Sequence, residues 1–106
     1  MALEIQNVTA GAVVDRKVPI RVYNAAIAAK TRITDDRVVI TQIYWYSPDA
    51  VNALAAFQDK AGNALFAMHA TVASQGLLFG PIRIPANGIY MDDLDSGEIY
   101  IYLENL

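Results

Sequence analysis

Towards its end the sequence runs Glu98-Ile99-Tyr100-Ile101-Tyr102-Leu103, in which aliphatic and aromatic side chains alternate. Successive side chains of a β-strand point to opposite faces of the sheet, so this run predicts a strand with one aliphatic face and one tyrosine face. The second face of an antiparallel strand is ordinarily polar and contacts water. We therefore expect the aliphatic residues to lie in the core of the subunit, and Tyr100 and Tyr102 to face a neighbouring molecule.

A second strand repeats this arrangement. The run Arg37 to Tyr46 is rich in β-branched and aromatic residues, which favour strands, and near its end Tyr44 and Tyr46 alternate with apolar residues. Thr34-Asp35-Asp36 precedes it and is typical of a turn. The sequence thus predicts a turn at these three residues and a strand that begins at Arg37.

The rest of the chain predicts short strands between turns. Segments 2–8, 18–27, 64–69, 77–84 and 89–91 are expected strands, with turns at 85–88 and 95–97. Because Pro19 has no N–H to donate, the strand around it should begin near Pro19 or lie at a sheet edge.

Residues 48–60 fit two alternatives. Ser47-Pro48 and the alanines that follow favour a helix that Gly62 would end. Alternatively, Ala53 to Gln58 is a strand joined by Asp59–Asn63 to a return strand, with Gly62 supplying the positive φ of the turn.

Many short strands with Gly, Pro and Asn turns indicate an all-β protein. The expected fold is a single domain over residues 1–106, an antiparallel β-sandwich and in particular a jelly roll, with 1–17 as an N-terminal strand or arm. Apolar residues make up 55% of the chain and charged residues 18%, against about 45–50% and 25% in typical domains. So little polar surface predicts a homo-oligomer.

The composition also argues against several classes of protein. A net charge of -3 without a basic run disfavours direct nucleic-acid binding. The absence of cysteine excludes a disulfide framework and a thiolate metal site. The sequence has no apolar stretch long enough for a membrane span, and no signal peptide is expected at its start.

From about Ile40 onward the order of features resembles a family of small phage structural proteins with a β-sandwich or jelly-roll fold. The resemblance rests on Trp45, Asp59-Lys60-Ala61-Gly62-Asn63, Leu77-Leu78-Phe79 with Pro81, Asn87-Gly88-Ile89-Tyr90, Leu94-Asp95-Ser96-Gly97 and Ile99-Tyr100-Ile101-Tyr102. It covers about two-thirds of the chain, and the sequence departs from the pattern at 50–56, where more β-branched residues are expected.

The resemblance implies a virion protein of the capsid surface, a decoration or cement subunit assembled in the host cytoplasm. It further implies a homotrimer whose partner is the major capsid protein, with the arm at 1–17 engaged in oligomer or capsid contacts.

Candidate chemistry is sparse. His69 is the only histidine, and a catalytic arrangement would have to combine it with Ser47, Ser74 or Ser96. The more economical interpretation places His69 on the solvent face of a strand. No catalytic residue, cofactor or metal ligand is predicted, and the protein is not expected to be an enzyme.

Four acidic residues lie close together in the sequence: Asp92, Asp93, Asp95 and Glu98. Oxygen ligands crowded in a turn suit Ca²⁺, but their spacing is not that of an EF-hand loop. A solvated turn that also protects the adjoining strand edges is the favoured interpretation.

Five tyrosines remain as the candidate site, predicted to form a subunit or capsid interface: Tyr44, Tyr46, Tyr90, Tyr100 and Tyr102. If their strands are neighbours, the rings form a stripe on one sheet. Such a stripe is a set of stabilising cross-strand pairs, an interface with another subunit, or a platform for sugars. The predicted function is accordingly a capsid cement or decoration subunit, with a carbohydrate- or receptor-binding module of a phage tail or fibre as the alternative.

Overall fold

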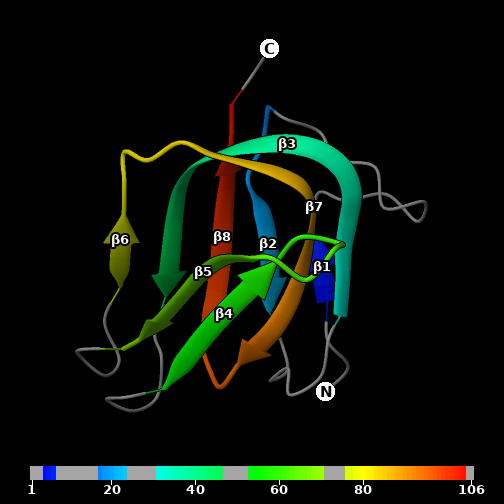
Figure 1. The fold of residues 1–106 in the computed structure, drawn as a ribbon. Helices are drawn as coiled ribbons and strands as arrows, with labels where there is room; N and C mark the ends of the chain where they lie inside the picture. Colours follow the sequence, from blue (N-terminus) through cyan, green and yellow to red (C-terminus); the bar gives the residue numbers. More distant parts are fainter. Residues whose placement is uncertain (1–3, 7–16, 24–30, 47–52, 71–75, 105–106) are drawn as a thin grey trace.

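Two long strands, β3 (Thr31–Tyr46) and β7 (Ile84–Leu94), arch over the molecule, and β3 belongs to both of its layers (Figure 1). The structure is a computed structural model and describes residues 4–6, 17–23, 31–46, 53–70 and 76–104. The other strands are β1 (Glu4–Gln6), β2 (Ile20–Tyr23), β4 (Leu54–Gln58), β5 (Ala64–His69), β6 (Leu77–Phe79) and β8 (Glu98–Leu103).

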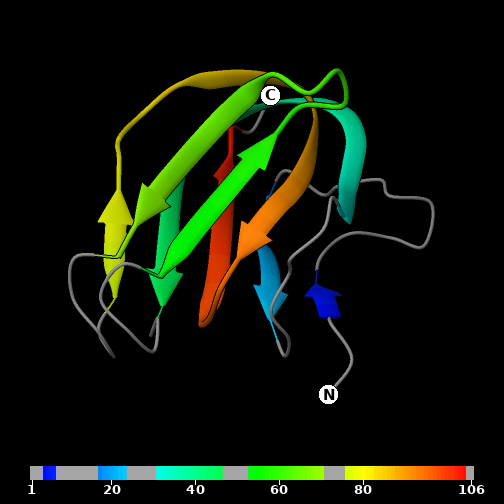
Figure 2. The ribbon, with the colours of Figure 1, turned by 60° about the horizontal axis from the view of Figure 1, so that its bottom comes forward.

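All strand pairs are antiparallel, in the order β1-β2-β8-β3-β7-β4-β5, and β6 also pairs with β3. The first part of β3, up to Ile40, pairs with β7, whereas the part after Ile40 pairs with β8 and β6. One layer is therefore β1-β2-β8-β3-β6 and the other is β3-β7-β4-β5, facing each other as Figures 1 and 2 show.

The prediction of an all-β antiparallel sandwich is confirmed, and the described residues contain no helix. The jelly roll stays a prediction, with which the strand orders of the two layers are consistent. The described ranges accordingly hold no helix that is long and apolar enough to span a membrane.

The core lies between the layers and is built from alternate residues of the strands. Its largest fully buried side chains are those of Trp45, Phe57, Ile20, Ile33, Ile40, Ile43, Ile89, Met91, Leu94, Ile99, Ile101 and Val22. Burial of each contributes roughly 1.5–3 kcal/mol. The indole N–H of Trp45 donates to the Ser96 carbonyl oxygen at 2.8 Å, so the polar atom of this large ring is satisfied.

The predicted turn at Thr34-Asp35-Asp36 is wrong, because these residues lie inside β3. The pairing of β3 with β7 shifts register between Arg32 and Thr34 and again between Thr34 and Arg37, where the strand bends. The Asp36 N–H donates to the Thr34 hydroxyl oxygen at 3.0 Å. This local side-chain bond is the one that makes such residues frequent in turns, and here it supports an irregularity within a strand.

The predicted turn at 85–88 is also wrong, since these residues belong to β7. Gly88 has a φ of +84°, and a Cβ there would lie 2.9 Å from the Thr34 carbonyl oxygen. Gly88 thus faces the irregular part of β3, and the two strands bend together at this corner.

The single strand predicted over 77–84 is divided in two. β6 ends at Phe79, a cis peptide bond joins Gly80 to Pro81, and β7 begins at Ile84.

Of the two alternatives for 48–60, the strand is confirmed over Leu54–Gln58, and 47–52 lie outside the described residues. Asp59 begins the predicted connection to β5: its carboxylate accepts hydrogen bonds from the backbone N–H groups of Ala61 and Asn63 and from the Asn63 amide. These bonds hold the pKa of Asp59 below its usual value. Gly62 has the predicted positive φ, +91°.

At the N-terminal end, β2 begins directly after Pro19, as predicted. Of the proposed arm at 1–17, Glu4–Gln6 pair with β2 as β1, while 1–3 and 7–16 lie outside the described residues.

Candidate functional site: the tyrosine face

Four tyrosines gather on the outer surface of β3 and β8. They line a shallow depression of about 300 Å³, and we call this surface the tyrosine face: Tyr44, Tyr46, Tyr100 and Tyr102. The alternate residues of the same strands point inward, and the expectation that Ile99, Ile101 and Leu103 lie in the core is confirmed.

The pairing of β3 with β8 brings the rings together. Tyr44 lies opposite Tyr100, with ring centroids 6.0 Å apart, and the Tyr44 and Tyr46 rings are stacked with centroids 6.2 Å apart. Two residues further along β8, Tyr102 lies opposite Gln42 of β3. Tyr46 is 49% exposed, so its ring offers a large apolar surface to solvent. Such rings present contact area with only two side-chain torsions to restrict.

Gly76 and Leu78 extend the face towards β6. A Cβ at Gly76 would overlap the Tyr44 hydroxyl, so this ring is seated directly against the glycine backbone. Leu78 lies opposite Tyr44 in the pairing of β3 with β6 and is 59% exposed. An aliphatic side chain therefore continues the aromatic surface across the strands.

A charged network borders the face on its other side. The Arg21 guanidinium donates to the two Glu98 oxygens at 2.8 and 3.1 Å and lies over the Tyr23 ring at 3.8 Å. The Tyr100 hydroxyl donates to Glu98 at 2.8 Å. The hydrogen bond from Arg21 lowers the pKa of Glu98, and the bond to Glu98 raises the pKa of Tyr100. The network fixes the Tyr100 ring and places charge beside an otherwise aromatic surface.

The fifth predicted tyrosine, Tyr90, is not part of this face. It lies on β7 opposite Arg32, in the other layer, and its hydroxyl donates to the Asp35 carboxylate. That hydrogen bond lowers the pKa of Asp35 and raises the pKa of Tyr90. The predicted stripe therefore forms from four of the five tyrosines.

The predicted acidic cluster divides into separate groups. Glu98 pairs with Arg21, whereas Asp93 hydrogen-bonds Asp95, whose carboxylate also accepts the Leu54 N–H at 2.8 Å. Among the described residues, no three His, Cys, Asp or Glu side chains are grouped so as to hold a metal ion.

His69 ends β5 with its side chain exposed, as predicted. Three serines were considered as partners of His69. The backbone carbonyl oxygen of Ser96 accepts a hydrogen bond from the Trp45 indole N–H, and Ser47 and Ser74 lie outside the described residues.

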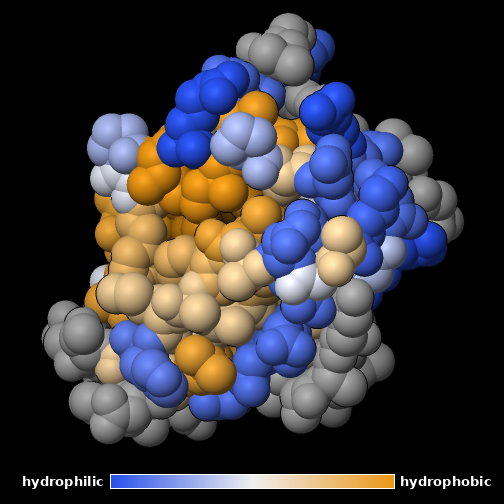
Figure 3. Space-filling model, in the orientation of Figure 1, coloured by the Kyte–Doolittle hydropathy of each residue, from blue (hydrophilic) through white to orange (hydrophobic). Residues whose placement is uncertain are grey.

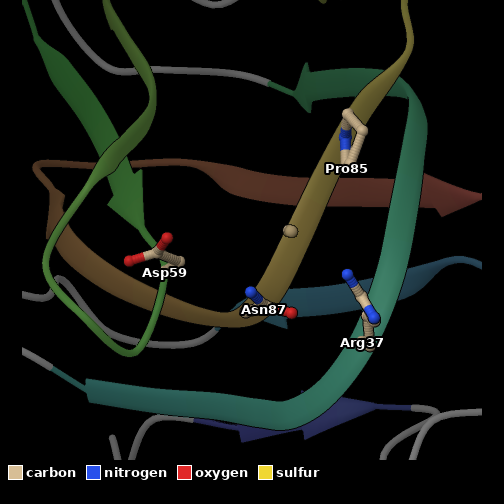
Figure 4. Close-up of a pocket in the computed structure, with 5 residues that line it drawn as sticks. Arg37, Asp59, Pro85 and Asn87 are labelled. Atoms are coloured by element: carbon tan, nitrogen blue, oxygen red, sulfur yellow. The ribbon is translucent and has the colours of Figure 1, made fainter.

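A second, smaller hollow lies at the bend of the sandwich. Its volume is about 100 Å³. Figure 4 shows Pro85 and Asn87 along β7, with Arg37 of β3 on one side of that strand and Asp59 on the other. The Asp59 carboxylate is already bonded within its own turn. Small-molecule sites ordinarily enclose at least about 300 Å³. This hollow is therefore too small to be such a site.

The sequence did not identify Arg21 as a site residue, and Glu98 was considered only as part of the acidic cluster. They are 77 positions apart in the sequence and meet because β2 pairs with β8. The sequence indicates only that each shares a strand face with a tyrosine two residues further on, Arg21 with Tyr23 and Glu98 with Tyr100.

Comparisons of the chain with models of protein families, with curated proteins and with solved structures found no match.

Proposed function

We propose that this chain is a non-enzymatic structural protein of a phage virion, a cement or decoration subunit that binds the assembled head and stabilises it. The observation that supports this proposal best is the tyrosine face, in which four rings of two paired strands lie together on one outer surface. The resemblance of the sequence to small phage structural proteins supports the phage virion as the assembly to which it belongs.

The tyrosine face has the composition of an interface core. Tyrosine is enriched in the buried centres of protein interfaces, and it is frequent among the few residues that carry most of the binding energy. Leu78 and Tyr46 add exposed apolar area at one side, and the pair Arg21–Glu98 supplies charge at the other. We assign the face to contact with the major capsid protein or with other copies in a homotrimer.

Stabilisation of the head follows from mass action. A subunit that binds only where shell proteins meet lowers the free energy of the assembled state and leaves the free shell protein unaffected. The chain needs no reaction centre for this role.

The experiment is cosedimentation of the purified chain with heads of the phage that encodes it, together with light scattering of the chain alone. We expect binding to heads, and a trimer or larger assembly in solution. Tyr46→Ala and Tyr102→Ala should each weaken head binding at least tenfold, because each removes a ring from the face.

Tyr90→Ala is the matched control, since it removes the same side chain from the other layer and should leave head binding unchanged. Equal loss in all three variants would point to a general folding defect, which circular dichroism would detect. Failure of the folded chain to bind heads would rule out the cement role.

One observation favours the second candidate, a carbohydrate- or receptor-binding module of a tail or fibre. Sugar sites combine aromatic rings with polar side chains that bind hydroxyl groups, and here Glu98 and Arg21 lie beside Tyr100. Glycan-array binding that is lost in Tyr100→Ala and in Glu98→Gln, with the fold intact, would favour this role. Absence of any glycan signal would exclude it for the glycans on the array.

A further inference from the structure

The last strand of the second layer, β5, has an open edge. β4 pairs with one side of β5, and in the part of the chain that the structure describes no strand pairs with its other side. An open edge presents a row of backbone N–H and C=O groups that another strand can pair with, and natural proteins usually protect such edges. Of the other end strands, β1 and β6 have three residues each, whereas β5 has six. The first part of β3, at the other end of the same layer, is longer but is protected by its charged residues: Arg32, Asp35, Asp36 and Arg37.

The sequence of β5 lacks the usual protection. It reads Ala-Leu-Phe-Ala-Met-His, without Lys, Arg, Asp, Glu or Pro. The one irregularity lies at its start: β4 pairs Phe57 with Phe66 and Gln58 with Ala64, so Leu65 is the extra residue of a bulge. From Phe66 onward the strand is regular.

The surroundings of this edge are apolar. The Phe66 ring packs on Phe57 at 5.1 Å and on Phe79 of β6 at 5.2 Å, and so connects the two layers. Figure 3 shows a broad hydrophobic region over the part of the molecule where Figure 1 draws β5 and β6. The partly buried apolar residues of these strands are Leu65, Phe66, Leu77 and Phe79.

We propose that the open edge of β5 pairs antiparallel with β5 of a second copy of the chain, about a two-fold axis at Ala67. A two-fold contact brings identical surfaces together, so it favours a strand without charge, because like charges placed opposite each other destabilise a strand pair. The net charge of -3 is carried outside this strand, which removes the main obstacle to self-pairing.

The register follows from the side chains. In a pair centred on Ala67, the two exposed Ala67 methyl groups are opposite each other and let the backbones approach. Phe66 then lies beside Met68 of the second copy, a favourable contact of sulfur with an aromatic ring. Centring the pair on Phe66 would instead oppose two rings that already pack on Phe57 and Phe79.

Cysteine cross-linking tests both the partner and the register. The chain has no cysteine, so Ala67→Cys introduces a single thiol. Opposed residues of antiparallel strands have Cα atoms about 4.5–5.5 Å apart, within the range of a disulfide. We expect oxidised Ala67→Cys to run as a covalent dimer on a non-reducing gel, with most of the chain cross-linked.

Ala64→Cys is the matched control, exposed on the same strand but three positions from the axis, so its two thiols lie too far apart to join. Equal cross-linking of both variants, or none in folded Ala67→Cys, would overturn the proposal. A disulfide of Ala67→Cys with a cysteine of the shell protein and not with itself would also overturn it, because it would identify a different occupant.

Light scattering separates this contact from the tyrosine face. Ala67→Lys should weaken self-association at least tenfold, while Ala61→Lys in the neighbouring exposed turn should not. If only Tyr46→Ala dissociates the oligomer, the strand pairing is refuted and the proposed function stands. If only Ala67→Lys does so and Tyr46→Ala still binds heads, the tyrosine face loses its role while the strand pairing stands.

Discussion

Asp93 and Asp95 form a carboxyl pair at the turn between β7 and β8. The hydrogen bond with Asp95, burial, and the charges of Asp95 and Asp92 raise the pKa of Asp93 to about 6. Its Oδ1 is buried without a hydrogen-bond partner. The same pair lowers the pKa of Asp95, so the two residues share one proton more readily than they share two charges.

This arrangement predicts that Asp93→Asn stabilises the protein at neutral pH. The folded pKa of Asp93, about 6, lies above its ordinary value of 3.8, so its contribution to stability is fully present below pH about 4 and is lost as the pH rises through 6. Asn keeps a donor for Asp95 and cannot ionise. Urea unfolding at pH 7.5 should show a gain of about 1 kcal/mol, discounted for partial exposure.

The gain should shrink when the same measurement is made at pH 4.5. Asp92→Asn is the control, because Asp92 is exposed and is only a minor cause of the shift. A gain from Asp93→Asn that is the same at both pH values would contradict the shared proton.

At the scale of the elements, β3 and β7 share a corner where Thr34 to Asp36 meet Gly88. Beyond this corner β7 also pairs with β4, while β3 stays paired with β7 up to Ile40 and only then pairs with β8 and β6. A bend shared by two paired strands needs one backbone to come close to the other. Gly88 provides that approach, since it has no Cβ and adopts a positive φ.

Gly88→Ala should therefore cost more than Gly62→Ala. Both glycines have a positive φ, +84° and +91°, so both substitutions carry the same backbone strain, about 1 kcal/mol. Only at Gly88 would the new methyl group also meet the Thr34 carbonyl oxygen, whereas nothing lies within 4 Å at Gly62. In urea unfolding we expect Gly88→Ala to lower the free energy of unfolding by at least about 3 kcal/mol. Equal losses for Gly88→Ala and Gly62→Ala would show that the corner accommodates the methyl group without strain.

The corner also marks the limit of sequence-based prediction. The turns predicted at 34–36 and 85–88 are wrong, because both segments lie inside strands. Asp, Asn, Gly and Pro favour turns, but they do not reveal whether the chain reverses or only bends, and Pro85 to Asn87 pair regularly with β3. Alternation was more informative, because a period of two identifies the two faces of β8 regardless of its partners. The pairing of Arg21 with Glu98 depends on which strands become neighbours, which a local pattern does not contain.

At the scale of the whole molecule, low charge and two apolar surfaces point to the same behaviour. Only 18% of the residues are charged, and the tyrosine face and the β5 edge lie on different strands. A subunit with two such surfaces can contact its own copies through one and a larger assembly through the other. Self-association then becomes part of its stability, because a partner that binds only the folded chain stabilises it.

The melting temperature should accordingly rise with protein concentration. Each tenfold increase in concentration favours a folded dimer over unfolded chains by about 1.4 kcal/mol per dimer, so a hundredfold range should raise the melting temperature by about 5 °C or more. Ala67→Lys should weaken this dependence, because it removes the β5 contact between copies and leaves the core of each subunit intact, while Ala61→Lys should keep it. A melting temperature of the unmodified chain that does not change over this range would show that the folded subunit is stable without its own copies, which would refute the association that both surfaces predict.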